Sequence, residues 1–188
     1  MMHKIFISIV IWISVSFFFV LHAQEYVSPT KPTETGKSPE VKTKLLSVNG
    51  TAKTYSLIFS PGDEILSGLE EFALRYNVKS AYFTAIGDAS FAKFGWYDES
   101  KKMFKVTEIK QPVEIVSLVG DIALYNNEPA VHCHIALAAE DGVLQGGHLL
   151  EAFISPTLEV MITVEPTPLY KKLDPEFSAL IIDPELKN

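Results

Sequence analysis

Helical periodicity occurs at one place in the body of this sequence, and strand-like segments fill almost everything after it. Apolar side chains recur at helical spacing from Ile65 to Tyr76, while Glu and Arg side chains occupy the other face. Asp63, which follows Pro61-Gly62, is the expected helix N-cap. One helix with a strand before it and strands after it predicts an α+β domain, a largely antiparallel sheet with one main amphipathic helix.

The expected strands are bounded by turn-forming residues. One strand, residues 54–60, precedes the helix. Gly87-Asp88, Asn126-Asn127 and Asp141-Gly142 are clear turn signals among the later ones. The strands expected after the helix are residues 80–86, 92–97, 103–108, 113–119, 122–125, 131–139, 143–150 and 158–164.

The first 23 residues differ from the rest of the chain. Lys4 precedes an uncharged apolar run, residues 5–21, and Ala23 suits the −1 position of a secretory cleavage site. Residues 1–23 are therefore predicted to be a signal peptide, with an uncleaved membrane anchor as the alternative. Either version exports the domain, to the periplasm or as a secreted protein. No stable membrane span is expected after cleavage.

The segment that follows has little to bury. Residues 24–44 combine three prolines with polar and charged side chains, a composition typical of a disordered linker that is ordered only where a neighbour holds it. The globular domain is expected over residues 45–183, and residues 184–188 form a short tail.

Composition excludes several classes of protein. The chain is 47% hydrophobic and 21% charged, values of a folded protein with a real core. Its net charge of −7 argues against the basic surface with which nucleic-acid-binding proteins bind phosphate groups. Cys133 is the single cysteine, so no intramolecular disulfide can form, and we expect it to be a small buried apolar side chain.

The histidines that remain after signal cleavage, His132, His134 and His148, gather in one short stretch. Alternate residues of a strand point to one face, so His132 and His134 share a face. An imidazole from the next strand completes a three-histidine group with an open position, as in catalytic zinc sites. We predict a divalent metal site, with zinc as the first choice. The alternative is a purely structural role for the three histidines.

The turn between the two histidine strands decides whether such a site can form. A two-residue hairpin at Asp141-Gly142 leaves His148 on the opposite face from the other two imidazoles. A shared metal therefore requires a shift of one residue in the pairing. We predict irregular backbone at Gly146-Gly147 as its source, because residues without Cβ permit unusual dihedrals; a three-residue loop serves equally well.

Carboxylates near this stretch are candidates for a fourth ligand or a catalytic general base. Glu114 is favoured, because it lies on an expected central strand, where an unpaired carboxylate is costly to bury. Glu159 and Glu165 are weaker candidates. A structural role of Glu114 at a subunit interface fits equally well.

Several short motifs follow each other in a fixed order between residues 53 and 165. They are Gly62-Asp63-Glu64-Ile65-Leu66, Thr84-Ala85-Ile86-Gly87, Glu114-Ile115-Val116-Ser117-Leu118-Val119-Gly120, His132-Cys133-His134, Asp141-Gly142, Gly146-Gly147-His148-Leu149 and Leu158-Glu159-Val160. Together they resemble the PPC (plants and prokaryotes conserved) domain family, and the resemblance implies an α+β domain that assembles as a homotrimer. The layout of His132, His134 and His148 also resembles acetolactate decarboxylase, whose zinc is held by an HxH pair and a later histidine.

These observations favour an exported, trimeric protein whose metal binds or transforms a small, oxygen-rich anionic compound. As an enzyme it would be a metal-dependent, lyase-like one, in which the metal polarises a carbonyl. One alternative is a DNA-binding or architectural protein, as in the plant relatives. The acidic charge, the export signal and the absence of an Arg-Gly-Arg-Pro AT-hook disfavour it. A metal-free interaction scaffold is the other alternative.

Overall fold

The computed structural model describes residues 23–187, so the predicted signal peptide lies outside the described residues except for Ala23. Within the described part, no helix combines the length and the apolar character that crossing a bilayer requires. One α-helix, α1 (Ile65–Arg75), and ten strands make up the regular structure of residues 23–187. The strands are β1 (Tyr26–Val27), β2 (Lys42–Asn49), β3 (Ala52–Phe59), β4 (Ser80–Asp98), β5 (Met103–Ile109), β6 (Val113–Tyr125), β7 (Glu128–Ala138), β8 (Leu144–Val164), β9 (Lys171–Asp174) and β10 (Ala179–Ile182).

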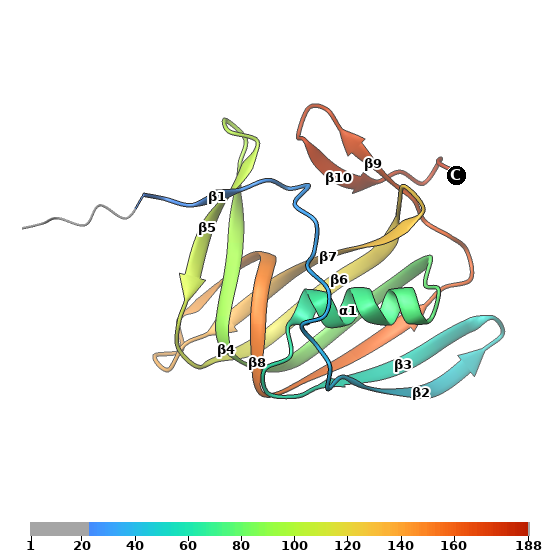
Figure 1. The fold of residues 1–188 in the computed structure, drawn as a ribbon, viewed down its shortest axis with the longest axis horizontal. Helices are drawn as coiled ribbons and strands as arrows, with labels where there is room; N and C mark the ends of the chain where they lie inside the picture. The colour runs from blue at the N-terminus through green and yellow to red at the C-terminus, as the bar shows by residue number, and fades with distance from the viewer. Residues whose placement is uncertain (1–22, 188) are drawn as a thin grey trace, which may run out of the picture.

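Eight of these strands form one antiparallel sheet, in the order β1-β5-β4-β6-β7-β8-β3-β2, and β9 and β10 form a separate hairpin. An additional pairing of β4 with β8 closes a circuit of strands, β4-β6-β7-β8. The sheet consequently curls around on itself, with α1 lying across it (Figure 1). The predicted α+β fold, a largely antiparallel sheet with one main helix, is confirmed.

Three pairs of strands that were expected to be separate are each one continuous strand in the structure. β4 runs through the predicted turn at Gly87-Asp88 as a strand of 19 residues. β6 covers the strands expected at residues 113–119 and 122–125, and β8 covers both strands expected after Asp141-Gly142. At Gly87 the pairing with β6 shifts register instead of ending. A Cβ on Gly87 would lie 2.3 Å from the carbonyl oxygen of Thr157, so this glycine permits the close approach of two strands rather than a reversal of the chain.

The helix begins one residue later than predicted, because Glu64 rather than Asp63 is its N-cap. The Glu64 carboxylate accepts hydrogen bonds from the backbone N–H groups of Leu66 and Ser67, at 3.2 and 2.7 Å. It also accepts one from Ala152 of β8, at 3.1 Å, which ties the start of the helix to the sheet. Asp63 instead closes the preceding turn, where its carboxylate accepts from the backbone N–H of Ser60 at 2.8 Å.

The core lies between the apolar face of α1 and the strands of the closed circuit. Leu69 of the helix and Leu118, Leu137 and Ile162 of the strands are completely buried in it. Cys133 is also part of this core, and burial raises the pKa of its thiol well above the ordinary range. The structure thus agrees with the expectation of a small buried side chain at Cys133.

Residues 24–44, predicted to be a linker that is ordered only where a neighbour holds it, contact neighbouring elements in the structure. Residues 24–41, here called the N-terminal strap, cross the molecule from β5 and pass in front of α1 (Figure 1), and β2 begins at Lys42. The backbone N–H of Val106 donates to Glu25 O at 3.0 Å, and that of Lys37 donates to Ser67 Oγ at 3.0 Å. Ser38 is buried. The strap is ordered because α1 and β5 satisfy its backbone polar groups, which composition alone does not reveal.

Candidate metal centre

The hairpin between β6 and β7 sets the position of the first two histidines. Asn126 and Asn127 both have positive φ, 50° and 66°, as a two-residue turn between paired strands requires. Tyr125 therefore pairs with Glu128, and the ladder continues without a break to His134. His132 and His134 lie on one face of β7, as predicted.

The hairpin between β7 and β8 brings in the third histidine. The backbone N–H of Ala139 donates to Val143 O at 3.3 Å, which leaves a three-residue loop with Gly142 at φ 74°. Pairing then runs regularly from Ala138 opposite Leu144 to His134 opposite His148. The one-residue shift therefore comes from the loop. The predicted irregularity at Gly146-Gly147 is wrong, since both residues are paired in register with β7.

Gly146 and Gly147 instead allow the backbones of the neighbouring strands to approach closely. A Cβ on Gly146 would lie 2.0 Å from Ile135 O, and one on Gly147 would lie 2.6 Å from Gly95 O. β8 is thus held tightly between β7 and β4 at the point where it carries His148.

The three imidazoles converge on one point. Their ring centroids are 5.0 to 5.5 Å apart, and one ligand nitrogen from each lies within 4.8 Å of the others. A tetrahedral zinc ion with bonds of 2.0–2.1 Å holds its nitrogens about 3.3 Å apart. Modest rotation of the three imidazole side chains would bring their nitrogens to this separation. Among residues 23–187, the group consists of these three imidazoles without a carboxylate.

The surroundings favour the neutral form of two of these imidazoles. Phe104 of β5 stacks on His148 with ring centroids 4.2 Å apart. Burial, assisted by the neighbouring His132, lowers the pKa of His148 to about 3. Burial and the same neighbour also lower the pKa of His134. Neutral imidazole is the form that binds a metal ion, so the donor set fits a divalent cation.

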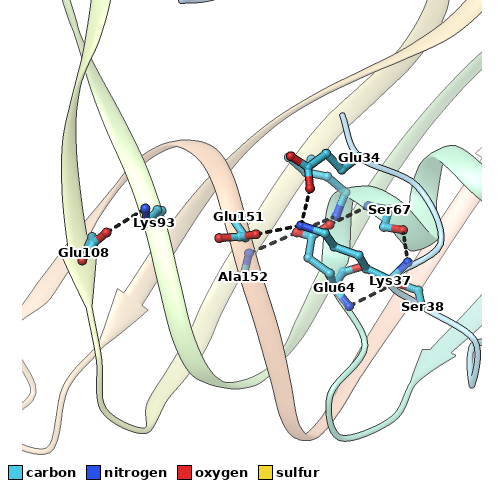
Figure 2. Close-up of polar contacts among 10 residues, drawn as sticks. Glu34, Lys37, Ser38, Glu64, Ser67, Lys93, Glu108, Glu151 and Ala152 are labelled. Atoms are coloured by element: carbon cyan, nitrogen blue, oxygen red, sulfur yellow. Dashed lines mark hydrogen bonds and ion pairs between the residues drawn. The ribbon is translucent and has the colours of Figure 1, made fainter. Parts of the chain in front are cut away.

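One side of the centre opens onto a cavity of about 640 Å³, which is lined by the strap, α1, β7, β8 and β10. Figure 2 shows polar contacts that hold the strap against α1 and β8. Lys37 forms ion pairs with Glu34 at 2.8 Å and with Glu151 of β8 at 3.2 Å. Glu64 and Lys93 also line the cavity. The wall of this cavity is apolar over much of its area, and it also carries both acidic and basic side chains.

Glu114 does not join the histidines. It is exposed, and it pairs with Ala138, four residues along β7 from His134, which corresponds to roughly 13 Å. Glu159 is exposed on the C-terminal part of β8, opposite Ile58 of β3. Neither carboxylate lines the cavity beside the three imidazoles.

Asp121 is the carboxylate that the structure does place at the centre, and sequence reasoning missed it. It lies opposite His132, with Oδ2 3.5 Å from His132 Nδ1, while Lys171 Nζ lies 2.7 Å from its Oδ1. Burial acts to raise the pKa of Asp121, but the polar contact with His132 and the charge of Lys171 together hold this pKa below its ordinary value. The two-residue turn at Asn126-Asn127 predicts this pairing, because it makes opposed residue numbers sum to 253. No sequence signal marks Lys171.

Fold and site together define an α+β domain with an open three-histidine centre. The chain belongs to the Plants and Prokaryotes Conserved domain family, abbreviated PCC or PPC, whose model matches residues 46–166. Among curated proteins, the bifunctional protein GlmU of Synechococcus sp. (strain JA-3-3Ab) is 26% identical over 129 residues, which is 63% of this chain. The chain spans about a fifth of the length of that relative, 20%.

Three solved structures are similar over most of their length. A PPC protein from Pyrococcus horikoshii is 29% identical, with a TM-score of 0.67 over 76% of this chain and 100% of its own. A candidate DNA-binding protein from Ralstonia eutropha JMP134 is 32% identical, with a TM-score of 0.65 over 69% and 90%. A metal-containing protein from Archaeoglobus fulgidus is 25% identical, with a TM-score of 0.64 over 76% and 96%.

Proposed function

We propose that this chain is an exported, trimeric PPC-domain protein that holds a divalent metal ion, zinc in the first instance, on His132, His134 and His148 and uses it to bind or transform a small, oxygen-rich anion. The observation that carries the proposal is the convergence of three imidazoles from two paired strands at the wall of an open cavity. A relative of similar fold is described as metal-containing, which supports the same conclusion.

The preference for an anion follows from charge. Three neutral imidazoles leave the full 2+ charge of the ion in place, and the open cavity gives access to the remaining coordination positions. A bound divalent ion supplies a Lewis acid that polarises oxygen ligands. Lys37 and Lys93 at the cavity wall add positive charge near the entering group, although each is already paired with a carboxylate.

Trimer formation is supported by an exposed apolar area on the outer face of the sheet. Tyr82, Ile86, Val119 and Met161 are 45% to 62% exposed. Thr84 pairs with both Val119 and Met161, so these side chains are neighbours on one face. A contiguous apolar area of this kind is typical of an interface, and further copies of this chain are the proposed occupants. Val119 also lies opposite His134, so the interface is adjacent to the metal centre.

Elemental analysis of the purified mature protein tests the metal site. We expect one zinc or other divalent ion per chain, and its loss on His134→Ala or His148→Ala. Gln145→Ala is the matched control, because Gln145 is exposed and lies on β8, the strand that carries His148. This variant is expected to retain the ion. Isothermal titration of oxalate and of chloride into the metal-loaded protein then tests the ligand class, with oxalate expected to bind. Metal-free wild-type protein after purification without chelators and addition of zinc would contradict the proposal.

A further inference from the structure

We propose that Asp121 and Lys171 are a positioning pair that orients the His132 imidazole toward the metal ion, and that a segment beyond the family domain thereby completes the centre. The inference rests on the proposed metal-binding function. Neither residue is a metal ligand in this scheme, and both act through His132.

The first step is the contact between Asp121 and His132. Asp121 Oδ2 lies 3.5 Å from His132 Nδ1, and the two residues are directly opposed across β6 and β7. An Nδ1–H that points at a carboxylate leaves Nε2 as the unprotonated nitrogen. A carboxylate behind a metal-binding histidine commonly fixes its tautomer and ring orientation in this way.

The second step is the fixation of Asp121 by Lys171. The Lys171 side chain is 2% exposed, and its Nζ lies 2.7 Å from Asp121 Oδ1 and donates to Ala130 O at 3.1 Å. A buried ammonium group is costly unless it is paired, so the lysine and the carboxylate hold each other in place. One carboxylate oxygen is thereby committed to Lys171, and the other faces His132.

The third step is the origin of Lys171. It lies in β9, outside residues 46–166 that match the family model. The preceding segment is fixed to the end of β6, where the backbone N–H of Leu124 donates to Leu169 O at 2.8 Å. Asp183 N–H also donates to Tyr170 O at 2.9 Å, which secures the β9–β10 hairpin against this segment. The C-terminal extension therefore delivers a buried cation beside the three histidines, at the wall of the same cavity.

Zinc affinity, measured by competition with a chromophoric chelator, tests the pair. Asp121→Asn keeps the shape of the side chain and removes its charge, and we expect it to weaken zinc binding about 10- to 100-fold. Lys171→Met is also expected to weaken zinc binding, whereas Lys171→Arg is expected to keep most of the wild-type zinc affinity. Gln145→Ala is the control. Zinc affinity of Asp121→Asn within twofold of wild type overturns the inference.

A second measurement separates this inference from the metal proposal. Nitrogen-15 NMR of the metal-free protein reports the tautomer of each imidazole, and we expect His132 in the Nδ1–H form in wild type and in a mixture of forms in Asp121→Asn. His134 should keep the same tautomer in both proteins. Failure of wild type to bind zinc contradicts the metal proposal alone, whereas an Nε2–H tautomer of His132 in wild type overturns the positioning pair. Should Lys171→Met fail to fold, Asp121→Asn decides the matter.

Discussion

His134 lies directly opposite His148 in the ladder between β7 and β8. The number of residues in the loop that joins the two strands sets this register. With a three-residue loop both side chains project from the same face, and with a two-residue loop they would project from opposite faces. The convergence of the three histidines therefore depends on the length of a hairpin loop that is itself exposed and remote from them.

Deletion of Glu140 tests this dependence. Removing one residue from the loop shifts the pairing by one position and turns His148 toward the core, so zinc binding should be lost. Glu140→Ala keeps the loop length and should bind zinc as wild type does. The measurement is zinc content after gel filtration, and retention of zinc by the deletion variant would show that register does not govern the site.

Two glycines near this loop should respond differently to alanine. Gly142→Ala meets no atom within 4 Å but has φ 74°, so it should lower the free energy of unfolding by about 1 kcal/mol. Gly146→Ala would place its Cβ 2.0 Å from Ile135 O, a backbone atom that cannot rotate away. It should therefore cost about 3 kcal/mol, at the upper end of overpacking effects. Urea unfolding of both variants provides the comparison, and equal losses would contradict the close-approach explanation.

The N-terminal strap should be protected from hydrogen exchange. The amides of Gly36 and Lys37 donate to Glu71 Oε1 and Ser67 Oγ at 2.6 and 3.0 Å, so both should exchange more slowly than in the unfolded chain. Ser67→Ala removes one acceptor and should accelerate exchange at Lys37 more than at Glu40, whose amide donates to Asp63. Exchange at the unfolded rate throughout residues 24–41 would restore the linker interpretation.

The proposed interface on the outer face can be disrupted by one charge. Ile86 is 62% exposed in the single chain, so Ile86→Lys should fold normally. In a trimer it would bury an unpaired ammonium group, and sedimentation equilibrium should report the mass of one chain instead of three. Val143→Lys, at an exposed position directly after the hairpin loop, is the matched control and should remain trimeric. A monomeric wild type at micromolar concentration would refute the trimer.

The mature protein should show no useful affinity for duplex DNA at physiological ionic strength, about 0.15 M. The full chain has a net charge of −7, and loss of Lys4 with the predicted signal peptide makes it −8, which provides no basic surface that could release counterions from phosphates. Fluorescence anisotropy with a labelled random duplex is the measurement, repeated at low salt. Salt-dependent binding at micromolar protein would instead favour the DNA-binding alternative, in line with the relative from Ralstonia eutropha described as a candidate DNA-binding protein.

Much of the site could be predicted from local pattern. The alternation of His132 and His134 on a strand is a property of strand geometry alone, and the clustering of the histidines identified His148 as their partner. Asp121 could also have been found, since the positive-φ turn at Asn126-Asn127 fixes the register of β6 and β7. The helix and the antiparallel sheet followed from periodicity in the same way.

Other features depend on contacts between distant segments, and sequence pattern misjudged them. Gly87-Asp88 has the residues of a turn, but Gly87 lies within a continuous strand because Thr157 approaches it so closely that a Cβ would not fit. The strap has the composition of a linker, but hydrogen bonds with Glu64, Ser67 and Glu71 satisfy several of its backbone polar groups. Propensity describes a residue's local preference, and a close approach or a distant hydrogen-bond partner can override it.

The sequence by itself determined the α+β fold, the helix, and the identity of three histidines able to share a metal ion, because periodicity and strand alternation are local properties. Only the tertiary structure decided that a three-residue loop aligns His148 with His134, that Glu114 lies apart from the centre, and that Lys171 fixes Asp121 behind His132. These last relationships join residues whose separation along the chain carries no signal, and they arise when the packing of the sheet brings the segments together.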